Sequence, residues 1–587
     1  MPRFHPGAPL FIAALLLIAG CVDDAAPPAD LILVGGQVVT VDPDNPTAEA
    51  VAVAADTILA VGSEADIRRF TGESTRVIDV DGALIIPGLI EGHGHYMSLG
   101  RSQMILDLTE AANWNEIVQK VADAAEQAES GEWIQGRGWH QEKWDSVPEG
   151  AVEGNPTHQS LSAVSPDNPV LLGHASGHAA FANAEAMRLA GISPETPDPA
   201  GGEILRDARG EPTGALRETA QGLVSRALSR ARQSMTVEEL DSERRTRARL
   251  AAEEALRNGI TSFQDAGSSL ETVDFLKRLA EEDALPVRLY VMIRDSNEDL
   301  AANLGDYMFV GLGDNHLTVR SIKRSIDGAL GSHGAWLLEP YEDLPSSAGL
   351  NTSTVESIER TAELAAEHGF QLNVHAIGDR ANREVLDIFE DAIEASGEGD
   401  HRWRIEHSQH LHPDDIPRFA DLGVIASMQG IHATSDAPWV LRRLGERRAE
   451  SGAYVWRTLW QSGAVVTNGT DVPVEKIDPI ASYYATVSRR LEDGGVFYLD
   501  ERLTREQALQ SYTLNNAFAA FEEDIKGSLT PGKLADITVL SQDILSIPEE
   551  SIPSTRVLYT IVGGRVLYDA AADRSPPGDT PKDKAID

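Results

Sequence analysis

The middle of the chain alternates strand-like apolar runs with amphipathic helical segments. Each strand-like run directly follows a helical one: 260–263 after 237–257, 370–374 after 354–368, 403–405 after 380–394, and 463–467 after 454–460. This order is typical of a parallel sheet whose strands are connected by helices. So many units in one stretch favour a (β/α)₈ TIM barrel, an α/β fold, over an open sheet.

Short β-type segments lie at both ends of this region. Residues 31–34 and 37–41 are separated by turn signals, and comparable runs return at 535–540, 557–562 and 565–568. We therefore predict a composite β-sandwich subdomain built from both termini. The expected boundaries are 31–82 and 525–572 for this subdomain, 83–524 for the barrel, and about 101–235 for a Trp-, Gly- and Pro-rich insertion that forms a cap.

The first residues have the pattern of an export signal. An apolar run at 10–18 is too short to span a bilayer, and it leads into Cys21 through small residues, as in a bacterial lipoprotein box. We expect a signal peptide at 1–20, lipidation of Cys21, a flexible tether at 21–30 and a disordered tail at 573–587. The alternative is an ordinary signal peptide that contains a cysteine. Either way the protein is expected to be exported, and the lipoprotein would face the periplasm or the cell exterior.

The charge balance narrows the partners. The chain has 50 Lys and Arg against 92 Asp and Glu, a net charge of −42. An acidic surface does not neutralise phosphates, so nucleic acid is excluded, and membrane contact is expected only through the lipid anchor. A single cysteine excludes an internal disulfide. The expected partner is a small-molecule substrate; the oligomeric state stays open, with a homodimer among the options.

Two histidines follow the apolar run at 83–87. His93 and His95 are two residues apart, and side chains at i and i+2 of an extended strand point the same way, so both could bind one ion. A second His-x-His pair, His410 and His412, precedes a helix start instead of ending a strand. We interpret that second pair as a surface feature without a role in metal binding.

Further metal-competent residues each end a predicted strand. They are Lys323, His375, His407 and Asp471. In an α/β barrel the carboxyl ends of the strands converge on one face, where the active site lies. Residues far apart in the sequence thus become neighbours, and the sequence predicts a metal centre there.

These motifs resemble the amidohydrolase superfamily over nearly all of the chain. The similarity is greatest to the amidohydrolase-3 branch, which includes N-substituted formamide deformylases. The matching stretches are IPGLIEGHGH at 86–95, DPAGG at 198–202, KRSIDG at 323–328, VHAIGDRA at 374–381, RIEH at 404–407 and GKLAD at 532–536. The family combines a (β/α)₈ barrel with a composite β subdomain, in agreement with the pattern above.

The resemblance implies a set of roles. His93 and His95 would hold one divalent ion, with zinc the expected metal, and His375 and His407 a second. Lys323 would bridge the two ions as a carbamate, and Asp471 would complete the first site. A hydroxide shared by the ions would attack an amide or N-substituted formamide, with Asp471 as general base and then general acid. An ordinary buried lysine paired with Asp327 is the alternative for Lys323.

Four residues are candidates for substrate binding: Trp139, His178, Asp327 and His432. Core packing is the competing explanation for Trp139, and a structural role in the cap is the one for His178. His140, next to Trp139, stands where the branch usually has an acidic residue, so no role is carried over to it.

Two other functions remain open. A mononuclear, deaminase-like amidohydrolase would have a carboxylic acid close to the third histidine, but 374–379 contains no Glu. A small-molecule-binding lipoprotein on an inactive scaffold would be expected to lack a ligand, and all six positions are filled.

Overall fold

The core of the protein is a parallel β-barrel. The computed structural model describes residues 27–573 except 176, 178, 234 and 398. In that part of the chain eight strands follow one another around the barrel, each parallel to the next. They are β8 (Leu89–Gly94), β15 (Ile260–Ser268), β16 (Arg288–Ile293), β18 (Leu317–Ser325), β19 (Gln371–Ala376), β20 (Arg404–His407), β21 (Ile425–Gln429) and β22 (Val466–Gly469). The predicted (β/α)₈ fold is confirmed.

The barrel closes where its first strand meets its last. The side chain of Asn516 bridges β8 and β22 by donating hydrogen bonds to the carbonyls of Ile90 (2.7 Å) and Asn468 (2.8 Å). A Cβ atom at Gly92 would lie only 2.4 Å from the Asn468 carbonyl oxygen. Glycine therefore permits the close approach of the two strands, and the Asn516 amide supplies the hydrogen bonds that a regular ladder would otherwise make.

Helices on the outside of the barrel begin at residues that cap a helix N-terminus, or end at a glycine that adopts a positive φ. α7 (Val237–Arg257) begins with a capping box between Thr236 and Glu239, and α8 (Leu270–Glu281) is capped by Ser269. α11 (Val355–His368) ends at Gly369, whose φ of 72° is favourable for glycine. Other helices of the barrel are α12 (Asp379–Ser396), α13 (Ile416–Leu422), α14 (Gly430–Gly452), α15 (Trp456–Ser462), α16 (Pro479–Ser488), α17 (Arg505–Ser511) and α18 (Leu514–Ala519).

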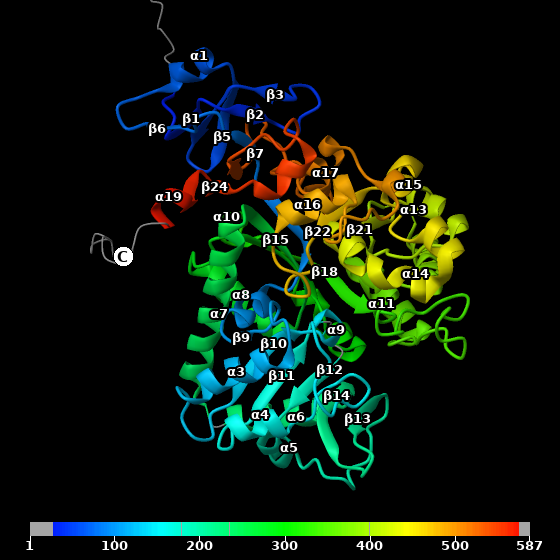
Figure 1. The fold of residues 1–587 in the computed structure, drawn as a ribbon. Coiled ribbons are helices and arrows are strands. Elements are labelled where there is room, and N and C mark those ends of the chain that lie inside the picture. Colours follow the sequence, from blue (N-terminus) through cyan, green and yellow to red (C-terminus); the bar gives the residue numbers. More distant parts are fainter. Residues whose placement is uncertain (1–26, 176, 178, 234, 398, 574–587) are drawn as a thin grey trace, which may run out of the picture.

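Both ends of the chain contribute to a subdomain of two packed sheets (Figure 1). One sheet has the order β5 (Thr57–Gly62), β4 (Ala50–Ala54), β1 (Leu31–Val34), β6 (Arg76–Asp79). The other has the order β25 (Arg565–Asp569), β24 (Val557–Val562), β23 (Ile537–Leu540), β7 (Leu84–Pro87), β2 (Gln37–Val39), β3 (Thr47–Ala48). The strand β7 thus belongs to this subdomain, and the barrel starts at Leu89 instead of residue 83. Ala29, expected in the tether, is already buried here.

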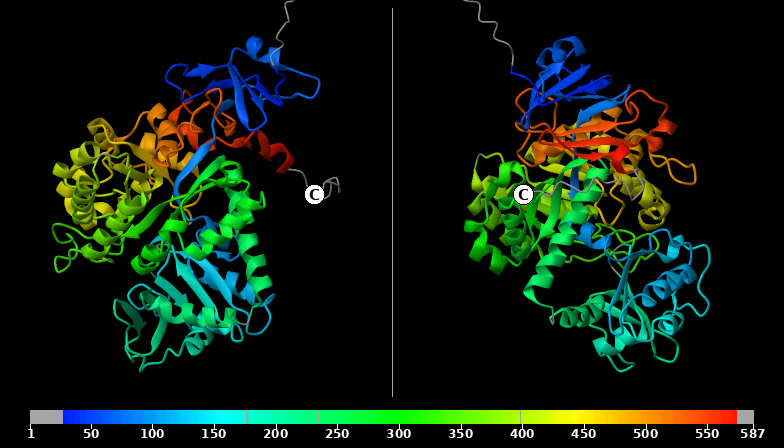
Figure 2. Two further views of the ribbon diagram at one scale, coloured as in Figure 1. Left: turned by 180° about the vertical axis from the view of Figure 1, so that it is seen from behind. Right: turned by 90° about the vertical axis from the view of Figure 1, so that its left-hand side faces the viewer.

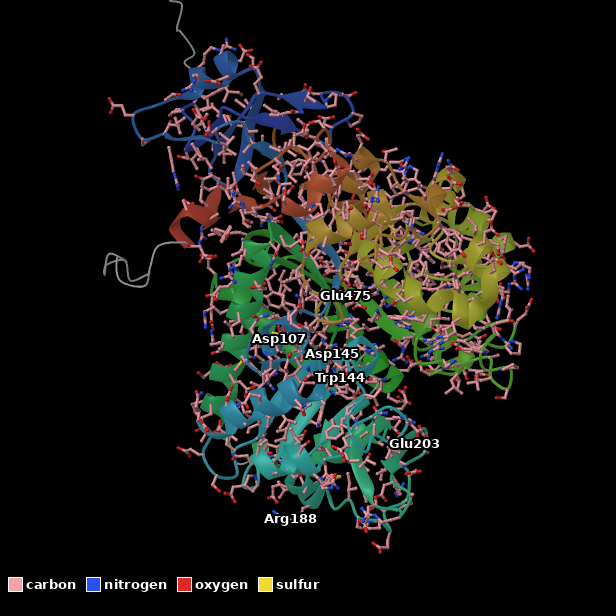
Figure 3. The ribbon with its side chains drawn as sticks, viewed as in Figure 1. Asp107, Trp144, Asp145, Arg188, Glu203 and Glu475 are labelled. Carbon is pink, nitrogen blue, oxygen red and sulfur yellow. The ribbon has the colours of Figure 1, made fainter. Side chains whose placement is uncertain are left out.

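The predicted insertion forms a separate lobe at the end of the barrel opposite the two-sheet subdomain (Figures 1 and 2). Its sheet has the order β13 (Gly202–Arg206), β14 (Pro212–Glu218), β12 (Ala179–Ala182), β11 (Val170–His174), β10 (Ile134–Trp139), β9 (Leu106–Asp107). The helices α3 (Trp114–Ala125), α4 (Gln159–Val164), α5 (Ala184–Ala190) and α6 (Gln221–Arg232) accompany it. The cap contacts the barrel through an ion pair between Glu110 and Lys476, next to Glu475, which Figure 3 labels.

A buried ion pair ties the barrel to the C-terminal strands. Arg288 at the start of β16 donates to both carboxylate oxygens of Asp536 (2.8 and 3.1 Å), and both side chains are almost fully buried. Burial alone would raise the pKa of Asp536, but Arg288 more than offsets this and holds it below its ordinary value of 3.8. The ionised carboxylate of Asp536 therefore stabilises the fold fully above pH 3.8, and this stabilisation is lost as the pH falls through the lower pKa of the folded state.

We expect Asp536→Asn to lower the free energy of unfolding by about 3 kcal/mol at pH 7, because Arg288 stays buried without its counter-charge. Urea unfolding of the full chain measures this. The gap between wild type and variant should shrink as the pH falls below about 4. Asp241→Asn, which removes half-buried surface pairs with Arg245 and Arg278, is the matched control and should cost less than about 1 kcal/mol. Equal losses in the two variants would contradict the assigned role of Asp536.

Candidate metal centre

His93, His95 and Asp471 come together at the carboxyl ends of β8 and β22. The backbone N–H of Asp471 donates to the carbonyl of His93 (2.7 Å), which fixes the loop after β22 against β8. Asp471 Oδ1 lies 3.2 Å from His95 Nε2 and 3.7 Å from His93 Nε2. One ligand atom from each of the three residues lies within 4.8 Å of the others. This grouping agrees with the first predicted site.

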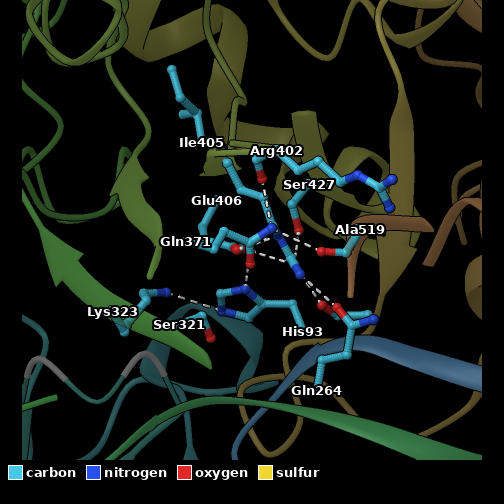
Figure 4. A network of polar contacts seen from close by, with 12 residues as sticks. His93, Gln264, Ser321, Lys323, Gln371, Arg402, Ile405, Glu406, Ser427 and Ala519 are labelled. Carbon is cyan, nitrogen blue, oxygen red and sulfur yellow. Dashed lines mark hydrogen bonds and ion pairs between the residues drawn. The ribbon is translucent and has the colours of Figure 1, made fainter. Parts of the chain in front are cut away.

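The orientation of His93 is set by a carboxylate that the sequence analysis did not single out. His93 Nδ1 donates a hydrogen bond to Glu406 Oε2, so Nδ1 carries the proton and Nε2 is left with a lone pair (Figure 4). Arg404 contacts the other oxygen of Glu406 at 2.9 Å and also donates to Ser427 and the Gly92 carbonyl. Although burial would raise the pKa of Glu406, Arg404 and His93 hold it well below its usual range.

His375 and His407 form the neighbouring part of the centre, with ring centroids 4.4 Å apart. The Nδ1 of His407 donates a hydrogen bond to Gln429 Oε1 (2.7 Å), so its Nε2, like that of His93, is left with a lone pair. His432 completes a second close group with His407 and Asp471. The structure thus brings His375, His407 and His432 to the same place, at the ends of β19, β20 and β21.

The imidazoles of His93, His375 and His407 are neutral at physiological pH. Burial is the main cause: it lowers the pKa of His93 to about 4, helped by the positive charge of Lys323, and holds that of His375 and His407 well below 6.5. Burial by itself would raise the pKa of Asp471, but the nearby histidines keep it well below its ordinary value. Neutral imidazoles and an ionised carboxylate are the protonation states that bind metal.

Lys323 is buried on β18, with Nζ 3.4 Å from His93 Nε2. Burial lowers its pKa to about 8, and the positive charge of Arg294 adds to this effect while Glu406 opposes it. At pH 7 about one tenth of the molecules therefore carry Lys323 as an uncharged amine, far more than for a lysine with the ordinary pKa of 10.5. In the described part of the chain no ion pair joins Lys323 to Asp327, the alternative considered from the sequence.

Two of these residues have strained backbones. His407 has φ 81° and Asp471 φ 58°, in the left-handed region that residues with a Cβ rarely adopt. Such conformations are retained mainly where the surroundings enforce them, and they cluster at functional sites.

The residues fit a metal centre by a test independent of sequence. Within the described residues, His375 Nε2 and Asp471 Oδ1 are buried yet make no hydrogen bond. Buried polar atoms without hydrogen bonds are rare and costly, so two in one cluster indicate a ligand. Imidazole nitrogens and carboxylate oxygens are the donors that zinc and related divalent ions bind.

Other sequence predictions turn out differently. Trp139 is not on a substrate surface: it is 1% exposed, donates to the Leu172 carbonyl and packs in the core of the cap. Asp327 is near His375, but its carboxylate accepts hydrogen bonds from the backbone N–H groups of Trp336, Ile377 and Gly378, so it positions the loop after β19. His178 and Cys21 lie outside the described residues.

The second His-x-His pair is only partly at the surface. His412 is the exposed N-cap before Pro413, as the helix start predicted. His410, by contrast, is 2% exposed and packs edge-on against Tyr454. Its expected surface position was therefore wrong, because Leu411 lies along Gly452 of α14 and carries His410 inward.

Comparison with known proteins supports the same assignment. A model of the amidohydrolase family matches residues 76–568. The chain belongs to the amidohydrolase family. As an amidohydrolase it is 33% identical to the Protein LONG AFTER FAR-RED 3 of Arabidopsis thaliana, over 92% of each chain. It is also 27% identical to an N-substituted formamide deformylase of Arthrobacter pascens, over 92% of this chain and 98% of the relative.

A solved structure agrees with the fold of this amidohydrolase. An uncharacterised metal-dependent hydrolase from Pyrococcus horikoshii OT3 superimposes with a TM-score of 0.71 at 26% identity, covering 89% of this chain and 99% of that one. Family and structural neighbour together identify the protein as a hydrolase of a metal-dependent family, with candidate ligands in the cluster described above.

Proposed function

We propose that the protein hydrolyses the C–N bond of an amide or N-substituted formamide with two divalent ions, zinc the expected metal. The observation that carries this proposal is the cluster of buried, unpartnered imidazole and carboxylate atoms around Asp471. The deformylase relative acts on N-substituted formamides by its name, which supports this substrate class.

Each ion would be held by two histidines. His93, His95 and Asp471 would bind the first, and His375 and His407 the second, with Lys323 as a bridging carbamate. Carbon dioxide reacts with the uncharged amine, and the lowered pKa of Lys323, about 8, supports this modification. When bound, the ions would lower the pKa of a water molecule and polarise the scissile carbonyl.

Asp471 would transfer a proton from the attacking water to the leaving nitrogen of the substrate. Its carboxylate is ionised, and Oδ1 lies among the candidate ligands, 3.2 Å from His95 Nε2, so it can accept a proton from water and deliver it to the leaving nitrogen. His432 would contact the substrate and would not bind an ion. Gln409 Nε2 lies 3.1 Å from His432 Nδ1 and donates a hydrogen bond to it, so the ring proton is on Nε2. That N–H would donate to the carbonyl oxygen of the substrate, which is why His375 and not His432 is assigned to the second ion.

Metal content of the full chain, measured by plasma mass spectrometry after growth with zinc and bicarbonate, tests the proposal. Two ions per chain are expected, together with hydrolysis in a panel of N-formyl and N-acyl amines. One ion per chain would favour the mononuclear alternative. No bound ion would overturn the metal mechanism and leave a binding protein on an inactive scaffold.

We also propose that the protein is exported and lipid-anchored at Cys21, which rests on the sequence alone. In the part of the chain that the structure describes, no helix is long and apolar enough to cross a membrane. Radiolabelled palmitate incorporation in cells, present in the wild type and lost in Cys21→Ser, tests the anchor.

A further inference from the structure

An arginine lies beside Lys323 at the end of the neighbouring strand. Ile293 of β16 is paired with Ile322 of β18, so the next residues, Arg294 and Lys323, are side by side on the same face of the barrel. Gly267 lies between them: a Cβ atom there would be 2.9 Å from Cδ of Arg294 and 3.5 Å from Cγ of Lys323. The Arg294 side chain therefore lies next to the proposed bridging ligand.

Arg294 differs from Arg324, the arginine that follows Lys323 on β18. Arg324 donates to the Asp295 carbonyl and to Asn297 Oδ1 at 2.8 and 3.0 Å, so its guanidinium is held in place. Arg294 is exposed, and its side chain has a single long contact, 3.5 Å to Ser325 Oγ. No carboxylate lies within 4.0 Å of it among the described residues.

A guanidinium without a nearby carboxylate is suited to bind an anionic ligand. No acidic side chain of the described chain compensates the positive charge of Arg294. An arginine presents a planar fork of N–H donors that matches a carboxylate with two parallel hydrogen bonds. It also lies on the face where substrates of α/β barrels bind.

We propose that Arg294 binds a carboxylate of the substrate, so that the preferred substrates are amides or formamides that carry a carboxylate. This inference rests on the proposed function, because it places the substrate at the metal centre. The competing role for Arg294 is to pair with a carbamate on Lys323, in which case its loss would lower metal content instead of changing substrate preference.

Binding of non-hydrolysed probes separates these roles. We would titrate the zinc-loaded full chain by calorimetry with the monohydroxamates of malonic, succinic and glutaric acid, and with the terminal amide of each as its neutral counterpart. Hydroxamates bind zinc whether or not the protein turns over amides. Wild type is expected to bind the best carboxylate probe about 10- to 100-fold more tightly than its neutral amide.

Three variants complete the experiment. Arg294→Gln should lose that preference while keeping its zinc and its affinity for the neutral probe, and Arg294→Lys should retain part of it. Arg249→Gln removes an exposed arginine of α7, paired with Glu253, and should behave as wild type. Equal binding of both probes by wild type, an unchanged preference in Arg294→Gln, or loss of zinc from that variant would overturn the role of Arg294. Failure of every probe to bind wild type would overturn the metal centre itself, and the role of Arg294 with it.

Discussion

Asp471→Asn is expected to reduce turnover by about 10³-fold or more while most of the bound metal is kept. An amide oxygen can still coordinate an ion, but asparagine cannot take a proton from water or return one to the leaving nitrogen. The position of Asp471, ionised and in contact with His95 and His93, is the physical reason for so large an effect. Steady-state kinetics and metal analysis of the same preparation measure the two quantities.

Asp478→Asn is the matched control for this variant. Asp478 follows in the same loop and caps α16 through the N–H of Ala481, without contact to the metal centre. The control should keep near-wild-type turnover, since asparagine is also a good N-cap. Turnover by Asp471→Asn within tenfold of wild type would remove Asp471 from the proton-transfer role.

Lys323→Met is expected to abolish turnover and to lose at least one of the two ions. Methionine nearly preserves the volume of the side chain, so packing around β18 should survive, but it offers no amine to carry a carbamate. Lys323→Arg keeps a positive charge that also cannot be carbamylated, and should be equally inactive. Metal content, and the carbamate signal in ¹³C NMR of protein grown with labelled bicarbonate, are the measurements.

A half-buried lysine on the outside of the barrel provides the comparison. Lys277 on α8 lies over the ring of Phe309, far along the chain from the ligand residues, and Lys277→Met should leave metal content and turnover unchanged. Two tightly bound ions and full activity in Lys323→Met would show that Lys323 is a structural lysine.

The clustering of the candidate ligands could be predicted because it obeys a simple rule of the fold. His93, Lys323, His375 and Asp471 each lie at or just beyond the carboxyl end of a strand, and the strands are recognisable by their apolar runs. Apart from their residue type, nothing in the sequence around these positions marks them as candidate ligands. They lie close together because the carboxyl ends of all barrel strands are on the same face of the barrel.

Glu406 could not be predicted in the same way. In a regular strand Glu406 and His407 would point to opposite sides, so only one of them could serve the centre. Both do so because His407 has φ 81°, which turns its side chain back toward His375. A backbone departure of this kind depends on the surrounding structure and leaves no mark in the hydrophobic pattern.

The misplaced residues have a related cause. Trp139 was assigned from its residue type, in a cap where the chain has no clear period. His410 was assigned to the surface because its pair precedes a helix start. β7 was joined to the barrel because it runs directly into β8, separated only by Gly88. Its partners, β2 and β23, lie far away in the sequence, and only long-range pairing decides to which sheet a strand belongs.

The closure of the barrel by Asn516, between β8 and β22, depends on the last part of the chain to be synthesised. A ribosome that has reached the end of β21 has already made His93, His95, Lys323, His375 and His407, yet β8 still has no partner on its other side. Asp471, the Asn516 bridge and β23 all come from the last part of the chain. An incomplete product would expose an open sheet edge and several free histidines. The cluster around His93 and the barrel that surrounds it are therefore complete only once Asp471 and Asn516 are present.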